Sequence, residues 1–228
     1  MKTRIQKTVK AGNITLKLKK DPIKNINPIK LITPDLSLIM LILSNILTIY
    51  LAITQHWNLI IIMWIYWFQS IIIGIFNFIR ILTLNNFSTE NFKVNDNYVE
   101  ATKATKKGTA FFFLFHYGFF HFAYMIFMLV GTFSDPNIFT KQTIFLIFIS
   151  VIIFLANHLF SFIKNYENDS KKVRNIGTIM FFPYARIVPM HLTIVFGLFL
   201  ATNTIAILFF MILKTLADII MHQIEHKL

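Results

Sequence analysis

The chain has 228 residues, of which 56% are hydrophobic and 26 are phenylalanine, and its mean hydropathy is +0.63. An ordinary soluble domain does not carry so much apolar surface, so the composition excludes that class and indicates a protein that crosses a membrane several times. No cysteine is present, which excludes disulfide bonds and thiolate metal sites and leaves histidine and carboxylate as the strong metal ligands.

Residues 1–35 form a basic N-terminal segment in which Pro-Ile-Lys occurs twice and no helical period is sustained. We interpret it as a cytoplasmic tail on the inner membrane surface, where anionic lipid headgroups attract lysine. A short strand is expected at Ile14–Leu18, and disorder of the whole segment is the alternative. The net charge of +12 is explained by this tail and by the topology, so nucleic acid is not an expected partner.

Six apolar runs follow, and each is long enough to span about 30 Å of hydrocarbon at roughly 1.5 Å per residue. They predict helices at 36–55, 58–82, 109–131, 142–163, 183–202 and 204–225. A tight turn at Ala201–Thr204 is expected between the last two, because one helix over both would be about 60 Å long. The sequence therefore predicts an all-α polytopic membrane helix bundle of about six transmembrane helices over residues 36–228.

The basic residues predict how this bundle is oriented. Of 22 Lys and Arg residues, nine precede Leu31, four lie in the loop after the second run, and four lie in or beside the loop after the fourth. The other three loops contain only Lys141. By the positive-inside rule both termini are cytoplasmic, and the chain is expected in the cell membrane as a multi-pass protein.

Polar side chains within the predicted helices gather at one depth, in the cytoplasmic half of the bilayer. The outer half carries almost only small hydroxyls that can bond their own helix backbone. The residues of the layer are Gln69, Asn77, Arg80, His116, His121, Asn157, His158, Ser161, Asn165, Arg186, His191, Lys214, Asp218 and His222. Because a charge at the bilayer centre costs on the order of 3 kcal/mol, this layer is the candidate functional site.

Imidazole and carboxylate groups in the layer suggest a divalent metal site, since Zn, Fe and Mn accept such ligands. The candidate ligands are His116, His158, His191, Asp218 and His222. His116 and His121 lie about 140° apart around one helix, so both could face the site only through a distorted turn, which Gly118 permits. We favour His116 as the member of the site.

Arg80 and Arg186 lie near the predicted cytoplasmic edge, where they could hold the phosphate of a lipid headgroup by bidentate hydrogen bonds. Simpler interpretations exist for several residues of the layer. The arginines could extend to the headgroups at the membrane surface, and Lys214 and Asp218, spaced i and i+4, could neutralise one another. Lone Asn and Ser residues often only bridge neighbouring helices.

Five segments between Tyr66 and His222 carry motifs that are weak alone and more specific together. They are YWFQSIIIGIFNFIR, HYGFFHF, NHLFSFIKN, FPYARIVPMHLTIVFG and KTLADIIMH. In combination they resemble an uncharacterised prokaryotic family of integral membrane proteins, domain of unknown function 6498. The resemblance implies a six-helix membrane domain and supplies no activity. It also implies that Glu is common where this chain has Gln69, and it leaves the basic tail outside.

Three functions compete for this sequence. The first is a membrane enzyme whose cytoplasm-facing site binds a divalent metal or a lipid headgroup, so that membrane lipid is the expected partner. The second is a non-catalytic scaffold subunit with protein partners in a membrane complex, in which the polar layer only joins helices. The third is a proton-coupled transporter, which the apolar outer half disfavours because a path needs polar groups through both leaflets.

Overall fold

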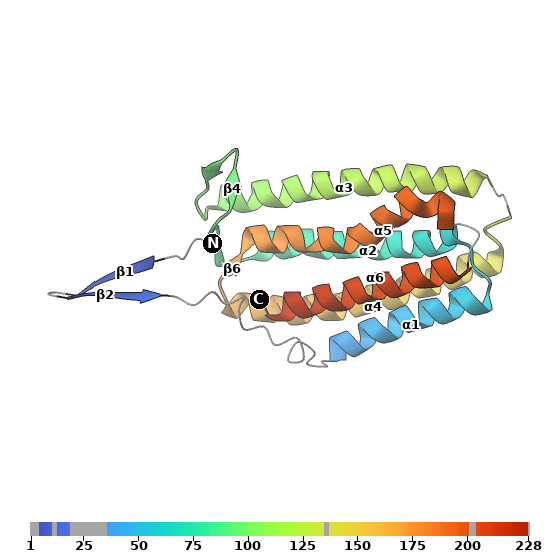
Figure 1. The fold of residues 1–228 in the computed structure, drawn as a ribbon, viewed down its shortest axis with the longest axis horizontal. Coiled ribbons are helices and arrows are strands. Elements are labelled where there is room, and N and C mark those ends of the chain that lie inside the picture. Colours follow the sequence, from blue (N-terminus) through green and yellow to red (C-terminus); the bar gives the residue numbers. More distant parts are fainter. Residues whose placement is uncertain (1–4, 11–12, 19–35, 135–136, 201–203, 228) are drawn as a thin grey trace. The chain divides into compact units, whose positions relative to one another are not determined.

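The computed structural model describes the chain in five stretches, residues 5–10, 13–18, 36–134, 137–200 and 204–227. Figure 1 draws the remaining residues as a grey trace. The chain divides into two compact units, Met1–Pro34 and Asp35–Leu228. The first unit contains a strand hairpin, and the second contains all the helices and the candidate site.

The hairpin of the first unit consists of β1 (Ile5–Lys10) and β2 (Asn13–Leu18), which pair antiparallel with Ile5 opposite Leu18. The strand expected at Ile14–Leu18 is therefore present and begins one residue earlier. Its partner was not predicted, because IQKTVK has too few apolar residues to indicate a strand by itself.

Six α-helices make up the second unit and confirm the predicted all-α class. They are α1 (Leu36–Thr54), α2 (Leu59–Thr83), α3 (Lys103–Phe133), α4 (Lys141–Lys171), α5 (Ile176–Leu200) and α6 (Thr204–Lys227). In the part of the chain that the structure describes, five of them, all except α5, are long and apolar enough to cross a membrane. Most of the turn expected at Ala201–Thr204 lies outside the described residues.

Helix α5 begins seven residues before the predicted start at Pro183. Proline favours the first turn of a helix, which is why the start was expected there. The cap lies instead at Asn175, whose Oδ1 accepts a hydrogen bond from the backbone N–H of Thr178 at 3.0 Å. Pro183 and Pro189 consequently lie inside α5, and the helix extends back to the loop that follows α4.

Short strands lie in two loops at one end of the helices, which we call the loop end. They are β3 (Phe87–Ser88), β4 (Lys93–Val94), β5 (Asn97–Tyr98) and β6 (Arg174–Asn175). β3 pairs in parallel with β6, so the α2–α3 loop is held to the α4–α5 loop. β4 and β5 form a hairpin whose turn residues, Asn95 and Asp96, have φ of 49° and 61°. Both residue types tolerate this left-handed backbone, which suits a tight hairpin turn.

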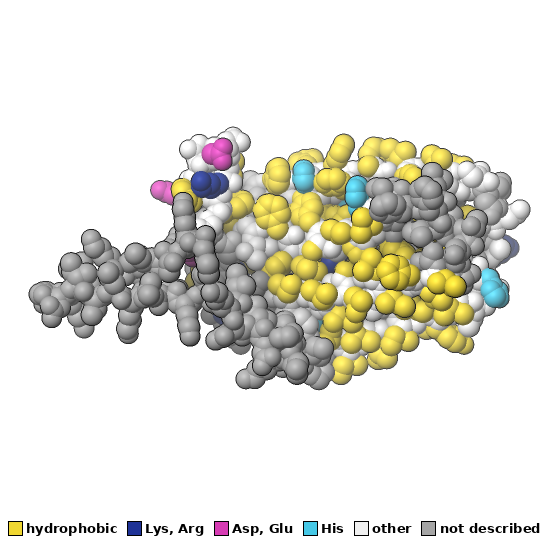
Figure 2. All heavy atoms as spheres, viewed as in Figure 1, with side chains coloured by type: hydrophobic (Ala, Val, Ile, Leu, Met, Phe, Trp, Pro, Cys, Tyr) yellow, Lys and Arg dark blue, Asp and Glu magenta, His cyan; other side chains and the backbone are white. Residues whose placement is uncertain are grey.

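Helix α2 is the centre of the bundle, since it packs against α3, α4 and α5, while α1 packs against α4 and α6 (Figure 1). Ile62, Ile65 and Tyr66 of α2 are almost completely buried. The outward face of the helices is apolar, with exposed residues such as Phe115 and Phe119, and Figure 2 shows hydrophobic side chains over the visible face. An apolar exterior around buried polar groups is the arrangement expected of helices in lipid.

Gly74 allows α2 to approach α3 closely. A Cβ atom at this position would lie 2.6 Å from Cε1 of Tyr117, which is too short for any real contact. Tyr117 cannot easily move aside, because its hydroxyl lies 3.0 Å from the carbonyl oxygen of Ser70 and 2.8 Å from Oγ of the same residue. The absent side chain therefore sets the spacing of these two helices.

Gly74→Ala should lower the free energy of unfolding by about 1–3 kcal/mol, the usual cost of overpacking a core. Gly118→Ala is the matched control, because a Cβ atom there would meet nothing within 4 Å. The control should be neutral or stabilising, since alanine has the higher helix propensity. Denaturant unfolding in detergent micelles measures both variants, and equal stabilities would show that the helices do not need this glycine.

Candidate functional site

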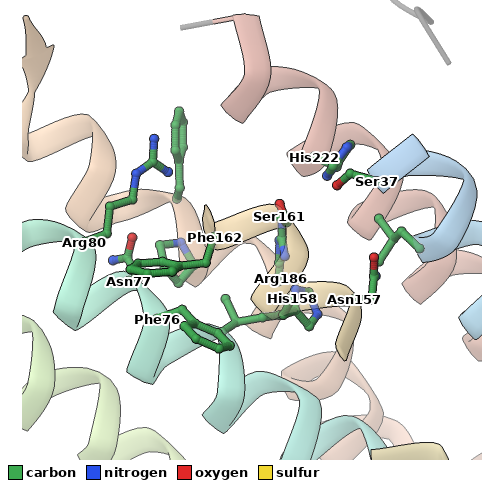
Figure 3. A pocket seen from close by; sticks show the side chains of 14 residues that line it. Ser37, Phe76, Asn77, Arg80, Asn157, His158, Ser161, Phe162, Arg186 and His222 are labelled. Carbon is green, nitrogen blue, oxygen red and sulfur yellow. The ribbon is translucent and has the colours of Figure 1, made fainter. Parts of the chain in front are cut away.

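One cavity at the loop end brings together four of the predicted site residues. Arg80, His158, Arg186 and His222 line this cavity of 50 Å³, which we call the arginine pocket (Figure 3). Its walls come from α1, α2, α4, α5 and α6, so distant parts of the sequence meet there. No carboxylate lines the pocket among the residues that the structure describes.

The structure does not bring His116 or His191 to the arginine pocket. His116 is exposed on α3, and its Nδ1 lies 2.9 Å from the hydroxyl of Tyr184. His191 is exposed on α5, and its Nδ1 lies 3.2 Å from the hydroxyl of Tyr124. These two predicted ligands therefore belong to the contact between α3 and α5.

His121, rather than His116, is the buried histidine of α3. The helix continues without a break through Gly118, so the distorted turn considered for this position is absent from α3. His121 Nε2 lies 2.8 Å from Oγ of Ser70, and its Nδ1 lies 2.8 Å from the carbonyl oxygen of Tyr117. Neither histidine lines the arginine pocket, so the preference for His116 as a member of this site is wrong, and His121 joins α3 to α2 instead.

Asp218 lies in a buried network behind His158, with Lys214, Gln69 and Asn45. Lys214 Nζ donates to Asp218 Oδ2 within α6 and to Gln69 Oε1 at 2.5 Å. Gln69 Nε2 and Asn45 Nδ2 donate to the same carboxylate oxygen at 3.2 and 3.4 Å. The mutual neutralisation considered for Lys214 and Asp218 is therefore present, and both side chains are buried.

This network determines which ring nitrogen of His158 carries the proton. Lysine only donates and ionised aspartate only accepts, so Gln69 must present Oε1 to Lys214 and Nε2 to Asp218. The same Nε2 lies 3.3 Å from Nε2 of His158, where the amide can again only donate. The neutral imidazole of His158 consequently accepts at Nε2 and carries its proton on Nδ1.

The described residues contain no group of three or more His, Cys, Asp or Glu side chains arranged to hold a metal ion. Of the five predicted ligands, His158 and His222 share the arginine pocket, and Asp218 is engaged by Lys214. The divalent metal site therefore stays a prediction, and elemental analysis of the purified protein tests it.

Three buried polar atoms that line the arginine pocket have no hydrogen-bond partner within the protein. They are Oγ of Ser37, Nδ2 of Asn77 and Oδ1 of Asn157. Leaving a buried polar atom unpaired costs about 1–3 kcal/mol, and most such atoms in proteins are paired. All three residues line the same cavity, where a bound group or water can supply the missing partners.

Arg80 is held at the edge of the pocket by Asp169, a residue that sequence reasoning missed. Its Nε and Nη2 donate to the two carboxylate oxygens at 2.5 and 3.1 Å. Arg174 Nε donates to the same carboxylate at 2.8 Å, so two guanidinium groups share one buried acid. The available signal was the scarcity of arginine, with four in the chain, but Arg174 was interpreted only as a loop charge.

Comparison with known proteins identifies the family. Residues 30–228 match DUF6498, a family of unknown function. The chain belongs to this family. The match contains every residue of the arginine pocket and of the Lys214 network, and it leaves most of the basic N-terminal tail outside. No curated protein and no solved structure matches the chain.

Lys214→Met should lower the free energy of unfolding by about 3–5 kcal/mol, because it leaves the carboxylate of Asp218 buried without its cation. The double variant Lys214→Met, Asp218→Leu should recover much of that loss, since no buried charge remains. Lys103→Met removes an exposed lysine and serves as the control. Unfolding in detergent micelles measures the stability of all three variants. If Lys214→Met is as stable as the wild type, Lys214 and Asp218 do not form an ionised pair.

Proposed function

We propose that the chain is an integral membrane protein that binds a phosphate-bearing amphiphile, with the phosphate in the arginine pocket. The observation that carries this proposal is the meeting of two buried arginines, Arg80 and Arg186, with two unpartnered donor groups, the hydroxyl of Ser37 and the amide nitrogen of Asn77, in one pocket. Guanidinium, amide and hydroxyl groups are the usual donors to phosphate oxygens. His158 and His222 add imidazole nitrogens, which can donate hydrogen bonds to phosphate oxygens.

The balance of buried charge also favours an anion. Among the described side chains, the buried cations are Arg80, Arg174, Arg186 and Lys214, and the buried carboxylates are Asp169 and Asp218. The four described cations and two described carboxylates therefore sum to a formal charge of +2. A site of this sign attracts an anion rather than a cation.

The size and the walls of the pocket indicate which part of the ligand it holds. A water molecule needs roughly 10–15 Å³ on the same measure, so a cavity of 50 Å³ suits a compact anionic group. Phe76 of α2 and Phe162 of α4 stack on one wall, with ring centroids 5.1 Å apart, and both are half-buried. An apolar wall beside two guanidinium groups favours an amphiphile over a free anion.

An alkyl monophosphate should raise the melting temperature of the purified protein, because a ligand that binds only the folded state stabilises it. Arg186→Gln should weaken this binding about tenfold or more, since a hydrogen bond to a charged group is worth about 1.5–3 kcal/mol. The matched control Lys103→Gln removes an exposed cation and should keep the wild-type affinity. A neutral alkyl glycoside of equal chain length should have no effect. Unchanged affinity in Arg186→Gln would contradict the proposal.

The same titration on Asn77→Leu separates binding from the scaffold alternative, in which the polar layer only joins helices. Nδ2 of Asn77 has no partner within the protein, so its removal breaks no hydrogen bond there. We expect unchanged or higher stability without ligand, together with weaker phosphate binding. A loss of stability with unchanged binding would favour the scaffold.

The proposal includes an orientation, with both termini and the arginine pocket on the cytoplasmic side of the cell membrane. It rests on the distribution of Lys and Arg, in which only Lys141 belongs to the loops assigned outside. The chain has no cysteine, so single cysteines can be introduced without background. In intact cells, Thr8→Cys should resist an impermeant thiol reagent, whereas Asn137→Cys should react. Labelling of the first variant would overturn the orientation.

A further inference from the structure

We propose that a second anion subsite adjoins the arginine pocket, which makes the ligand a diphosphate-bearing amphiphile. This inference rests on the proposed function and names the class of ligand more narrowly. A second cavity, of 270 Å³, lies at the loop end, and we call it the loop cavity. Arg80 and Phe182 line both cavities, so a group bound in the arginine pocket lies next to the loop cavity.

Arg174 is the residue that marks the loop cavity as a site for an anion. It lines the cavity and is 5% exposed, and its Nε donates to Asp169. Its Nη1 is buried and has no hydrogen-bond partner within the protein. A buried guanidinium nitrogen without an acceptor is costly, and a phosphate oxygen is the acceptor that this group takes most readily.

Two arginines and one glutamate are the charged residues that line the loop cavity in the described part of the chain, so its lining favours an anion. Arg80 and Arg174 share the single carboxylate of Asp169, so this buried triad has a formal charge of +1. Glu90 also lines the cavity, but it is exposed, and solvent and salt screen its charge. Asn175 and Thr178 add polar side chains on the wall formed by the start of α5.

Arg80 lines both cavities, and this is the reason that the two subsites suit one ligand. The two phosphoryl groups of a diphosphate are joined through one oxygen, so they must occupy neighbouring subsites. Arg80 lines the arginine pocket together with Arg186 and the loop cavity together with Arg174, so it can contribute to both subsites. A monophosphate would use the arginine pocket alone and would not need Arg174.

The test compares an alkyl monophosphate with an alkyl diphosphate of the same chain length, titrated into the purified full-length protein in detergent. The wild type should bind the diphosphate about tenfold more tightly, the gain expected from one additional charge-assisted hydrogen bond. Arg174→Gln should abolish this preference and keep the affinity for the monophosphate, which also reports that the variant is folded. Asp169 keeps Arg80 as its partner in this variant. Arg174→Lys, which keeps the charge but loses the forked donor geometry, should retain only part of the preference.

Equal affinities of the wild type for the two ligands, or a diphosphate preference that survives in Arg174→Gln, would overturn the second subsite and leave the proposed function intact. Binding of neither ligand would overturn both. Inorganic pyrophosphate serves as the arm without an alkyl chain, and binding as tight as that of the alkyl diphosphate would show that the ligand is a soluble anion rather than an amphiphile.

Discussion

The buried ion pair between Lys214 and Asp218 is the interaction on which the candidate site depends. Neither charge is stable alone among apolar helices, and the carboxylate is shared with Gln69 and Asn45, so α1, α2 and α6 meet at one oxygen atom. Gln69, Asn77 and Arg80 lie at i, i+8 and i+11 on α2, which is one stripe at 3.6 residues per turn. Once Gln69 faces the ion pair, Asn77 and Arg80 must therefore face the arginine pocket.

The amide of Gln69 has a role that an ionised carboxylate cannot fill. It accepts from Lys214 with one atom and donates to Asp218 and His158 with the other. An ionised Glu at this position would place two acids beside one lysine and could not donate to His158. In this chain the side chain of Gln69 joins α4 and α6 to α2 and fixes one tautomer of His158. It therefore shapes the pocket without supplying a charge.

Sequence reasoning predicted the six helices, because the length of an apolar run reports directly on a membrane-spanning helix. It also placed Arg80, His158, Arg186 and His222 in one layer, and these four share the pocket. Depth alone does not give the rotation of a helix, which explains why His116 was favoured over His121. Asp169 and Arg174 were missed because they follow the fourth apolar run, and only the folded loops carry them back to Arg80.

The buried charged side chains of the described residues lie on or beside the two cavities, and this favours binding over passage. A transport path needs polar side chains through the whole thickness of the bundle. Away from the loop end, the hydroxyls of Thr132 and Ser150 donate to carbonyl groups of their own helices, at 2.9 Å each, and so are not free to line a path. Among the described residues, the buried cations all lie in α2, α5, α6 or the strand β6, on the arginine pocket, the loop cavity or the ion pair beside them. Buried charges gathered at two adjoining cavities, within helices whose exterior is apolar, suit the proposed binding of a headgroup whose alkyl chain stays in the membrane.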